Sequence, residues 1–214
     1  MSRCRVVTVA VAGLLALAAG SAWAGVPTDQ LKGSIERVMK ILEDPALKQD
    51  GRIAERRAAV RKVVNDIFDF AETAKRSLSR HWQGRSDAER EEFVKLFGDL
   101  LERAYISKID FHGGERIAFI GEAVDGDFAT VRTKLVARQG IEVPVDYRLL
   151  RRGDRWLVYD VSIEGVGLVS NYRTQFNKII QTSSYQELVK KMKTKQEEFG
   201  VGEQAKAKSD ARNK

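Results

Sequence analysis

The sequence predicts an α+β protein in which N-terminal and C-terminal helices pack on a curved, four-stranded antiparallel sheet. Three observations predict this class. Apolar residues follow helical spacing up to about residue 105, then alternate in short runs separated by turn dipeptides, and return to helical spacing after about residue 170.

The N-terminus has the pattern of a cleavable export signal. Two arginines precede an apolar run at residues 6–19, and an Ala-Trp-Ala tripeptide forms a small-x-small cleavage site before Gly25. The run is shorter than the roughly 20 residues that span a bilayer. We therefore expect residues 1–24 to be a signal peptide and the mature chain to work in a bacterial periplasm.

The charge and length of the chain limit its organisation. The sequence has 37 basic and 30 acidic residues, a net charge of +7, which falls to +5 without the two leader arginines. We expect residues 25–200 to form one domain. Residues 201–214 lack large apolar side chains and predict a basic, disordered tail; a basic handle for anionic lipid or an acidic partner is the alternative. We expect no nucleic acid partner.

Few residues qualify for chemistry. The single cysteine, Cys4, lies in the leader, and neither His81 nor His112 has a helical i+4 ligand partner, so we expect no metal site. Asp66 and Asp69 lie one helical turn apart and are conceivable as an acid–base pair, although capping carboxylates are more common. We predict no catalytic residue, no cofactor and no enzymatic activity.

The N-terminal half predicts a series of helices. The first ends at an Asp-Pro pair at residues 44–45, and the second extends from about residue 52 to residue 67. The segment FDFAETAKRSL follows. Ser86 with Glu89 forms a capping box for a further helix, whose apolar stripe contains several aromatic residues.

Four strand-like runs follow, at residues 115–124, 128–138, 141–150 and 155–163. Glycine-containing turns separate them and indicate an antiparallel meander. Pro144 cannot donate to a ladder, so we expect a bulge or a non-bonded position there. Beyond the strands, Asn171 is the expected cap of one helix, Ser184 with Glu187 forms the capping box of another, and Gly200 is its expected end.

The last run has apolar side chains on both parities. Trp156 and Val158 fall on one face, and a second set falls on the other: Leu157, Tyr159, Val161 and Ile163. A solvated antiparallel sheet would leave one face polar, so we expect both faces to be covered. The second set either lines an apolar cavity or packs against ordinary core; the strand pattern leaves both open.

The segment WLVYDVSIEGVGLVSNYRTQF resembles the MlaC-type periplasmic lipid-binding family, also called the toluene-tolerance family. FDFAETAKRSLSRHW and FVKLFGDLLERAY resemble two further family segments, and the resemblance extends from about residue 26 to residue 193. The chain has Gly167 where the family commonly has Ser, and Leu78-Ser79 where it often has Leu-Gly.

The resemblance implies a non-enzymatic carrier. Such a protein would bind phospholipid acyl chains in an apolar cavity enclosed by the helices and the sheet. It would shuttle the lipid between an outer-membrane lipoprotein complex and the lipid-binding ring of an inner-membrane ABC transporter, which maintains outer-membrane lipid asymmetry. A carrier for another lipid such as a hopanoid, or a periplasmic adaptor that binds a peptide in a groove, is the alternative.

Candidate site residues follow from the strand pattern and the aromatic segments. The expected cavity wall comprises Phe70, Trp82, Phe93, Phe97, Leu100, Tyr105, Leu157, Tyr159, Val161, Ile163, Val166 and Phe176. Tyr172 and Arg173 are candidates for the headgroup at the cavity mouth. Alternatively, Arg173 pairs with Asp160 or Glu164 and stabilises the turn.

Overall fold

The computed structural model describes residues 25–49, 51–109 and 115–212, with side chains except at 106–109 and 199–212. The predicted leader and His112 lie outside the described residues. The elements, in order, are α1 (Val26–Glu43), α2 (Ile53–Ile67), α3 (Phe70–Leu78), a 3-10 turn η1 (Ser79–His81), α4 (Asp87–Ile109), β1 (Arg116–Asp125), β2 (Phe128–Val136), β3 (Glu142–Arg152), β4 (Arg155–Ile163), β5 (Val166–Gly167), α5 (Leu168–Thr182) and α6 (Tyr185–Arg212).

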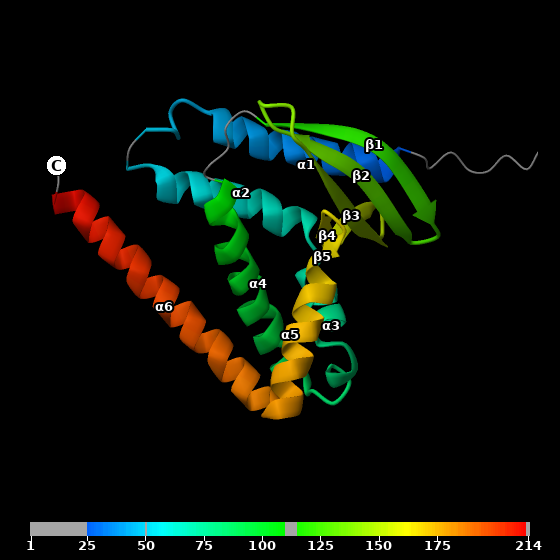
Figure 1. The fold of residues 1–214 in the computed structure, drawn as a ribbon, viewed down its shortest axis with the longest axis vertical. Helices are drawn as coiled ribbons and strands as arrows, with labels where there is room; N and C mark the ends of the chain where they lie inside the picture. The colour runs from blue at the N-terminus through cyan, green and yellow to red at the C-terminus, as the bar shows by residue number, and fades with distance from the viewer. Residues whose placement is uncertain (1–24, 50, 110–114, 213–214) are drawn as a thin grey trace, which may run out of the picture.

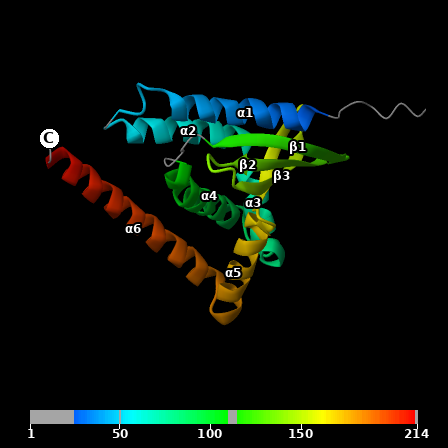
Figure 2. The ribbon, with the colours of Figure 1, turned by 45° about the horizontal axis from the view of Figure 1, so that its top comes forward.

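The predicted α+β class is confirmed. The sheet is antiparallel throughout and has the order β1-β2-β3-β4-β5, so the two-residue β5 adds a fifth strand to the four expected. Helices α1 and α2 form an antiparallel pair beside the sheet, and the remaining helices form a layer below it (Figures 1 and 2). None of the described helices has the length and apolar character needed to cross a bilayer.

Two bulges interrupt the sheet, and neither is at Pro144. Pro144 faces Lys134 in unbroken register, so the bulge expected there is absent from the strand pairs described. One shift lies in β1, between Phe119 and Gly121. The other lies in β4, because Arg148 pairs with Asp160 while its neighbour Leu149 pairs with Val158. Tyr159 is therefore the extra residue of β4.

The β4 bulge explains why apolar residues occupy both parities of that strand. An extra residue shifts the alternation by one position. Val161 therefore pairs with Tyr147 on the face that also carries Trp156 and Val158, rather than on the face of Leu157. The prediction that Val161 and Ile163 share a face with Leu157 is wrong, because the bulge is not visible in the alternation itself.

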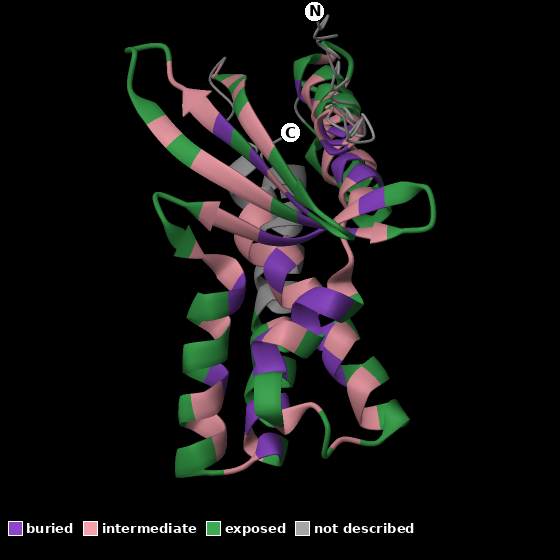
Figure 3. Cartoon of the chain, turned by 90° about the vertical axis from the view of Figure 1, so that its right-hand side faces the viewer, coloured by how far each residue is buried: buried purple, intermediate pink, exposed green. Residues whose placement is uncertain are grey.

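The core has two parts. The sheet core contains buried residues of the sheet and of α1: Leu31, Ala129, Val131, Leu149, Trp156 and Val158. The helical core contains buried residues of α3 to α6: Ala74, Leu78, Phe93, Leu96, Phe97, Leu101, Phe176, Tyr185, Leu188, Val189 and Met192. Figure 3 shows buried residues gathering in the helical layer and where the sheet approaches the helices, whereas the far strand ends are more exposed.

The helix starts agree with the predicted caps except in α5. The Ser86 amide donates to Glu89 at 2.8 Å and the Glu89 amide donates to Ser86 Oγ at 3.3 Å, which confirms that capping box. The Glu187 amide likewise donates to Ser184 Oγ, at 3.1 Å. Helix α5 begins at Leu168 rather than after Asn171, so the predicted Asn171 cap is wrong.

Helix α6 does not end at Gly200. Its backbone stays helical to Arg212, and Figure 1 shows this part extending away from the helical layer. Each glycine costs a helix only about 1 kcal/mol relative to alanine. Gly200 and Gly202 are followed mainly by alanine, lysine and glutamate or glutamine, which favour helix. The expected stop at Gly200 is therefore wrong for the backbone.

Candidate functional site

The inner face of the sheet, which carries Val131 and Trp156, is apolar along most of its length. Strand pairing places four alternate residues of β3 on this face: Val143, Val145, Tyr147 and Leu149. Only part of the face is covered. The buried residues lie under α1, where Leu31 and Ile35 pack against them.

Most of the rest of the inner face keeps solvent exposure, although Thr133, which lies between Phe119 and Val145, is buried. We call this part the open half; it consists of Ile117, Phe119, Leu135, Val143, Val145, Tyr147, Val161 and Ile163. All are intermediate in burial except Ile163, which is 42% exposed. Eight adjoining residues without a charge among them form an apolar surface that ordinary packing leaves incompletely covered.

Tyr147 lies where the covered part of the inner face meets the open half. Its side chain packs against the sheet core, and burial there raises the pKa of its phenol to about 12. It nevertheless keeps partial access to solvent. Tyr147 therefore marks the boundary between the two parts of the inner face.

An aromatic pair joins the sheet core to the helical layer. The Phe68 ring packs against the sheet core, and it stacks on the Phe70 ring with centroids 5.6 Å apart. Phe70 in turn packs against the helical core, where it lies beside Gly98 of α4. A β-carbon at Gly98 would lie 3.7 Å from the Phe70 ring, which is an ordinary van der Waals distance.

The helical layer contributes further partly buried aromatic residues. Tyr172 packs edge-on against Phe97, with ring centroids 4.9 Å apart, and also contacts Phe176. Burial, and to a lesser degree the nearby Tyr105, raises the pKa of the Tyr172 phenol. Tyr172 therefore lies at the edge of the helical core.

The predicted cavity residues divide into separate groups. Those of the helical layer come together: Phe93, Phe97 and Phe176 are buried in the helical core, and Phe70, Trp82, Leu100, Tyr105 and Tyr172 are partly buried against it. Val161 and Ile163 belong to the open half. Val166 is 64% exposed on β5.

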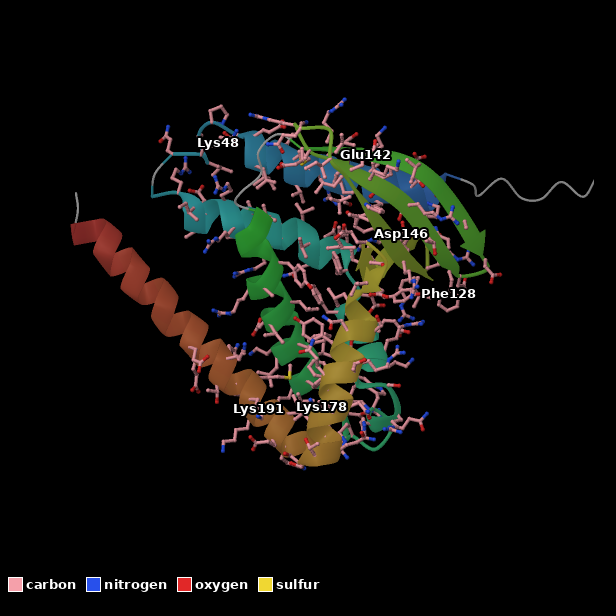
Figure 4. The ribbon with its side chains drawn as sticks, in the orientation of Figure 1. Lys48, Phe128, Glu142, Asp146, Lys178 and Lys191 are labelled. Atoms are coloured by element: carbon pink, nitrogen blue, oxygen red, sulfur yellow. The ribbon has the colours of Figure 1, made fainter. Side chains whose placement is uncertain are left out.

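Leu157 and Tyr159 do not share the inner face. Tyr159, the bulge residue, is buried between α3 and the start of β2: the Arg76 guanidinium lies 4.1 Å from its ring centroid, and the Phe128 ring packs edge-on at 6.4 Å. Figure 4 shows Phe128 at the end of the sheet nearer α3 and α5, with Glu142 at the opposite end.

Arg173 has neither of the two acidic partners proposed for it. Its Nε donates to the backbone carbonyl of Arg76 at 3.0 Å. Asp160 instead pairs with Arg148, at 3.4 Å. The alternative in which Arg173 pairs with Asp160 is therefore wrong, because a neighbouring strand supplies the arginine.

The candidate acid–base residues serve structural contacts. Asp66 pairs with Arg37 and Arg155, and the hydrogen bond from Arg37 is the main cause of its lowered pKa. Asp69 caps α3 by accepting from the Glu72 amide at 2.8 Å. Among the described residues, no group of three or more His, Cys, Asp and Glu side chains is placed to hold a metal ion.

Two pockets lie away from the predicted cavity residues. One, of about 330 Å³, lies between α1, α2 and β4 and is lined by Arg37, Asp66 and Trp156 among others. The other, of about 530 Å³, lies between α4 and α6 and is lined by charged residues together with Tyr185 and Val189. Neither includes any of the fourteen residues predicted for the cavity or its mouth.

Sequence reasoning missed Phe68, Phe119 and Tyr147 as site candidates. A signal for Tyr147 was available, since apolar residues alternate with polar ones along β3, and the turns on either side set its register. Phe119 precedes the β1 bulge and Phe68 lies between two helices, so local alternation could not assign their faces.

The fold and the site together define an α+β protein with an apolar, half-covered sheet face. The chain belongs to the MlaC family, because the family model described as "MlaC protein" matches residues 32–194.

One curated relative is the "Intermembrane phospholipid transport system binding protein MlaC" of Haemophilus influenzae. It is 25% identical over 138 residues, which are 61% of this chain and 64% of that protein. The match thus spans slightly less than two thirds of the relative.

A solved structure has a similar fold. It is the phospholipid-binding protein from Ralstonia solanacearum in complex with a phospholipid, with a TM-score of 0.71 and 23% sequence identity. The similarity covers 80% of this chain and 97% of that one, so the fold is shared over nearly the whole of the solved protein.

Proposed function

We propose that this protein is a periplasmic carrier that binds phospholipid by its acyl chains against the open half. It would move the lipid between an outer-membrane lipoprotein complex and an inner-membrane ABC transporter, and so maintain outer-membrane lipid asymmetry. The observation that carries the proposal is the uncharged, partly exposed surface of the open half, which a bound apolar ligand would cover.

The energetics of lipid transfer support a covered site. Two acyl chains carry on the order of 30 methylenes, each worth about 0.8 kcal/mol when removed from water. A lipid therefore crosses an aqueous compartment only if most of this area is covered. Residues of the open half offer such cover, next to the sheet core that the stacked Phe68 and Phe70 rings connect to the helical layer.

The family supports the transport role. The curated relative is named as the binding protein of an intermembrane phospholipid transport system, and the solved protein was obtained with a phospholipid. The export signal predicted for residues 1–24 supports a periplasmic location. Our proposal assigns binding and no reaction, since Asp66 and Asp69 serve in ion pairs and a helix cap.

Cargo analysis tests the proposal. Protein expressed with its leader and purified from the periplasm should retain about one diacyl phospholipid per chain, which mass spectrometry of an organic extract identifies. A hopanoid or a peptide in that extract would establish the corresponding alternative. Repeated preparations without any cargo would refute the carrier function.

A matched pair of variants locates the cargo. Val161→Trp places a large side chain on the open half and should lower lipid occupancy. Thr130→Trp makes a change of similar size on the outer face, beside Arg148, and should leave occupancy unchanged. Equal occupancy in the two variants would show that the lipid binds elsewhere.

A further inference from the structure

The Tyr147 hydroxyl has no protein acceptor among the described residues. No hydrogen bond between described residues involves the Tyr147 hydroxyl, and the hydroxyl is not among the fully buried polar atoms that lack a partner. Buried or partly buried tyrosines usually satisfy this group. Tyr185, for example, donates to the Glu89 carbonyl at 3.0 Å.

Tyr147 is also the one residue of the open half whose side chain can donate a hydrogen bond. Its cross-strand neighbours on that face are Val131 and Val161, and the rest of the open half is aliphatic or phenylalanine. With a pKa of about 12, the phenol keeps its proton at any physiological pH and stays a donor.

A ligand that covers the open half removes water from this donor. If the ligand presented only hydrocarbon there, the hydroxyl would remain desolvated and unpaired, which opposes binding. A ligand oxygen placed at Tyr147 would instead satisfy it. Binding therefore favours a lipid that places a hydrogen-bond acceptor next to the Tyr147 hydroxyl.

A phospholipid has two kinds of oxygen that could accept a hydrogen bond from Tyr147, namely those of the phosphate and those of the ester carbonyls. Phosphate oxygens are charged, and the open half offers no cation to replace their water. Ester carbonyl oxygens are neutral acceptors at the boundary between the headgroup and the acyl chains. They suit a single neutral donor on an apolar wall.

We propose that the Tyr147 hydroxyl donates a hydrogen bond to an ester carbonyl of the bound lipid and so favours ester-linked over ether-linked lipids. This inference rests on the proposed carrier function. An ether analogue keeps the headgroup and the chain length but lacks the carbonyl oxygen, and it therefore isolates the interaction.

A competition experiment tests the preference. Full-length mature protein is equilibrated with vesicles that contain equal amounts of dipalmitoyl phosphatidylglycerol and its di-O-hexadecyl ether analogue. The protein is separated, and mass spectrometry gives the ratio of ester to ether lipid bound. The wild type should favour the ester lipid about three- to tenfold, as expected for one hydrogen bond.

Tyr147→Phe removes the hydroxyl and retains the ring, and should bring the ratio close to that of the vesicles. Tyr185→Phe makes the same change outside the open half and should keep the wild-type ratio. The affinity of Tyr147→Phe for the ester lipid also distinguishes the two cases. If the hydroxyl donates to the lipid, its removal weakens binding. If the hydroxyl is buried by the lipid without an acceptor, its removal strengthens binding.

The outcomes separate this inference from the carrier function. A wild-type ratio equal to that of the vesicles, or stronger binding of both lipids by Tyr147→Phe, would overturn the role of Tyr147 while lipid carriage stands. Wild-type protein that takes up neither lipid would overturn the carrier function and this inference with it.

Discussion

Asp160 of β4 caps helix α5 from a different element: its Oδ1 accepts a hydrogen bond from the Val169 amide at 2.9 Å. The Asp160 side chain is only 3% exposed, and its other oxygen faces Arg148. Gly167, just before the helix, allows this approach, since a β-carbon there would lie 3.3 Å from Asp160 Oδ2. The strand and the helix that follows it are thereby held together.

Replacing Asp160 should therefore destabilise the protein. Asp160→Ala removes the cap and leaves Arg148 without this partner, and should lower the free energy of unfolding by about 1–2 kcal/mol in urea titrations. Asn171→Ala is the matched control, because Asn171 is the cap that local sequence favours. Equal losses from the two substitutions would show that Asp160 is not the cap.

Ser79→Gly should stabilise the protein. Ser79 adopts φ 53° and ψ −126° at the end of α3, a conformation that favours glycine. Such strain costs on the order of 1–3 kcal/mol, part of which the greater freedom of glycine in the unfolded chain offsets. We expect a net gain of about 0.5–1 kcal/mol.

Ser183→Gly is the control for this strain effect. Ser183 follows a helix as Ser79 does, but its φ of −140° lies outside the left-handed region that favours glycine. This substitution should bring no gain in urea or thermal unfolding. A gain at residue 183 as large as that at residue 79 would argue against relief of backbone strain.

Glu122 should make stability depend on pH. Burial alone would raise the pKa of its carboxyl, but hydrogen bonds from Thr28 and from the Gly25 amide outweigh burial and hold the pKa below its usual value. A carboxyl with a lowered folded pKa stabilises the fold above its unfolded pKa of about 4.3. That stability is lost as pH falls through the lower, folded pKa.

Urea midpoints measured against pH would reveal this contribution. Wild type should exceed Glu122→Gln at pH 6 to 7, and the difference should shrink as pH falls below about 4.3. Glu142→Gln removes a carboxylate that pairs with Lys134 on the exposed side of the sheet, and should give a smaller difference. A Glu122→Gln difference that grows with acidity would contradict a lowered pKa of Glu122 in the folded protein.

Removal of residues 203–214 should leave the melting temperature unchanged. Within this segment, residues 203–212 continue α6 beyond its described side-chain contacts with α4, of which the one nearest the C-terminus joins Gln196 to Asp99 at 2.6 Å. A longer deletion from residue 193 also removes the ion pair of Lys193 with Glu92 and should lower the melting temperature. A drop of several degrees from the shorter deletion would show that the tail is docked.

Local signals predicted the elements well because their causes are local. Ser86 with Glu89 is a capping box whose partners are three residues apart, and the hairpin turns contain the glycines that such turns require. Helical and strand periods then assign the segments between them. The boundaries of β1 to β4 consequently differ from the predicted runs by at most two residues at either end, and β4 has the predicted bounds.

The site was less predictable because its causes are not local. The bulge at Tyr159 reverses the faces of Val161 and Ile163, and no residue type announces it. The cap of α5 comes from Asp160, which strand pairing and a turn bring to the helix start. Tyr147 becomes prominent only when the part of the sheet that α1 leaves uncovered is known.

Glu122 would also link the structure to the predicted removal of the leader. Its carboxylate accepts hydrogen bonds from the Gly25 amide at 2.7 Å, the Thr28 amide at 2.8 Å and the Thr28 hydroxyl at 2.6 Å. Cleavage before Gly25 would turn that amide into a charged amino group, which binds a carboxylate more strongly. The processed chain would then hold its own new terminus against β1, so that removal of the leader would itself strengthen the fold and protect the first turn of α1 from further trimming by proteases.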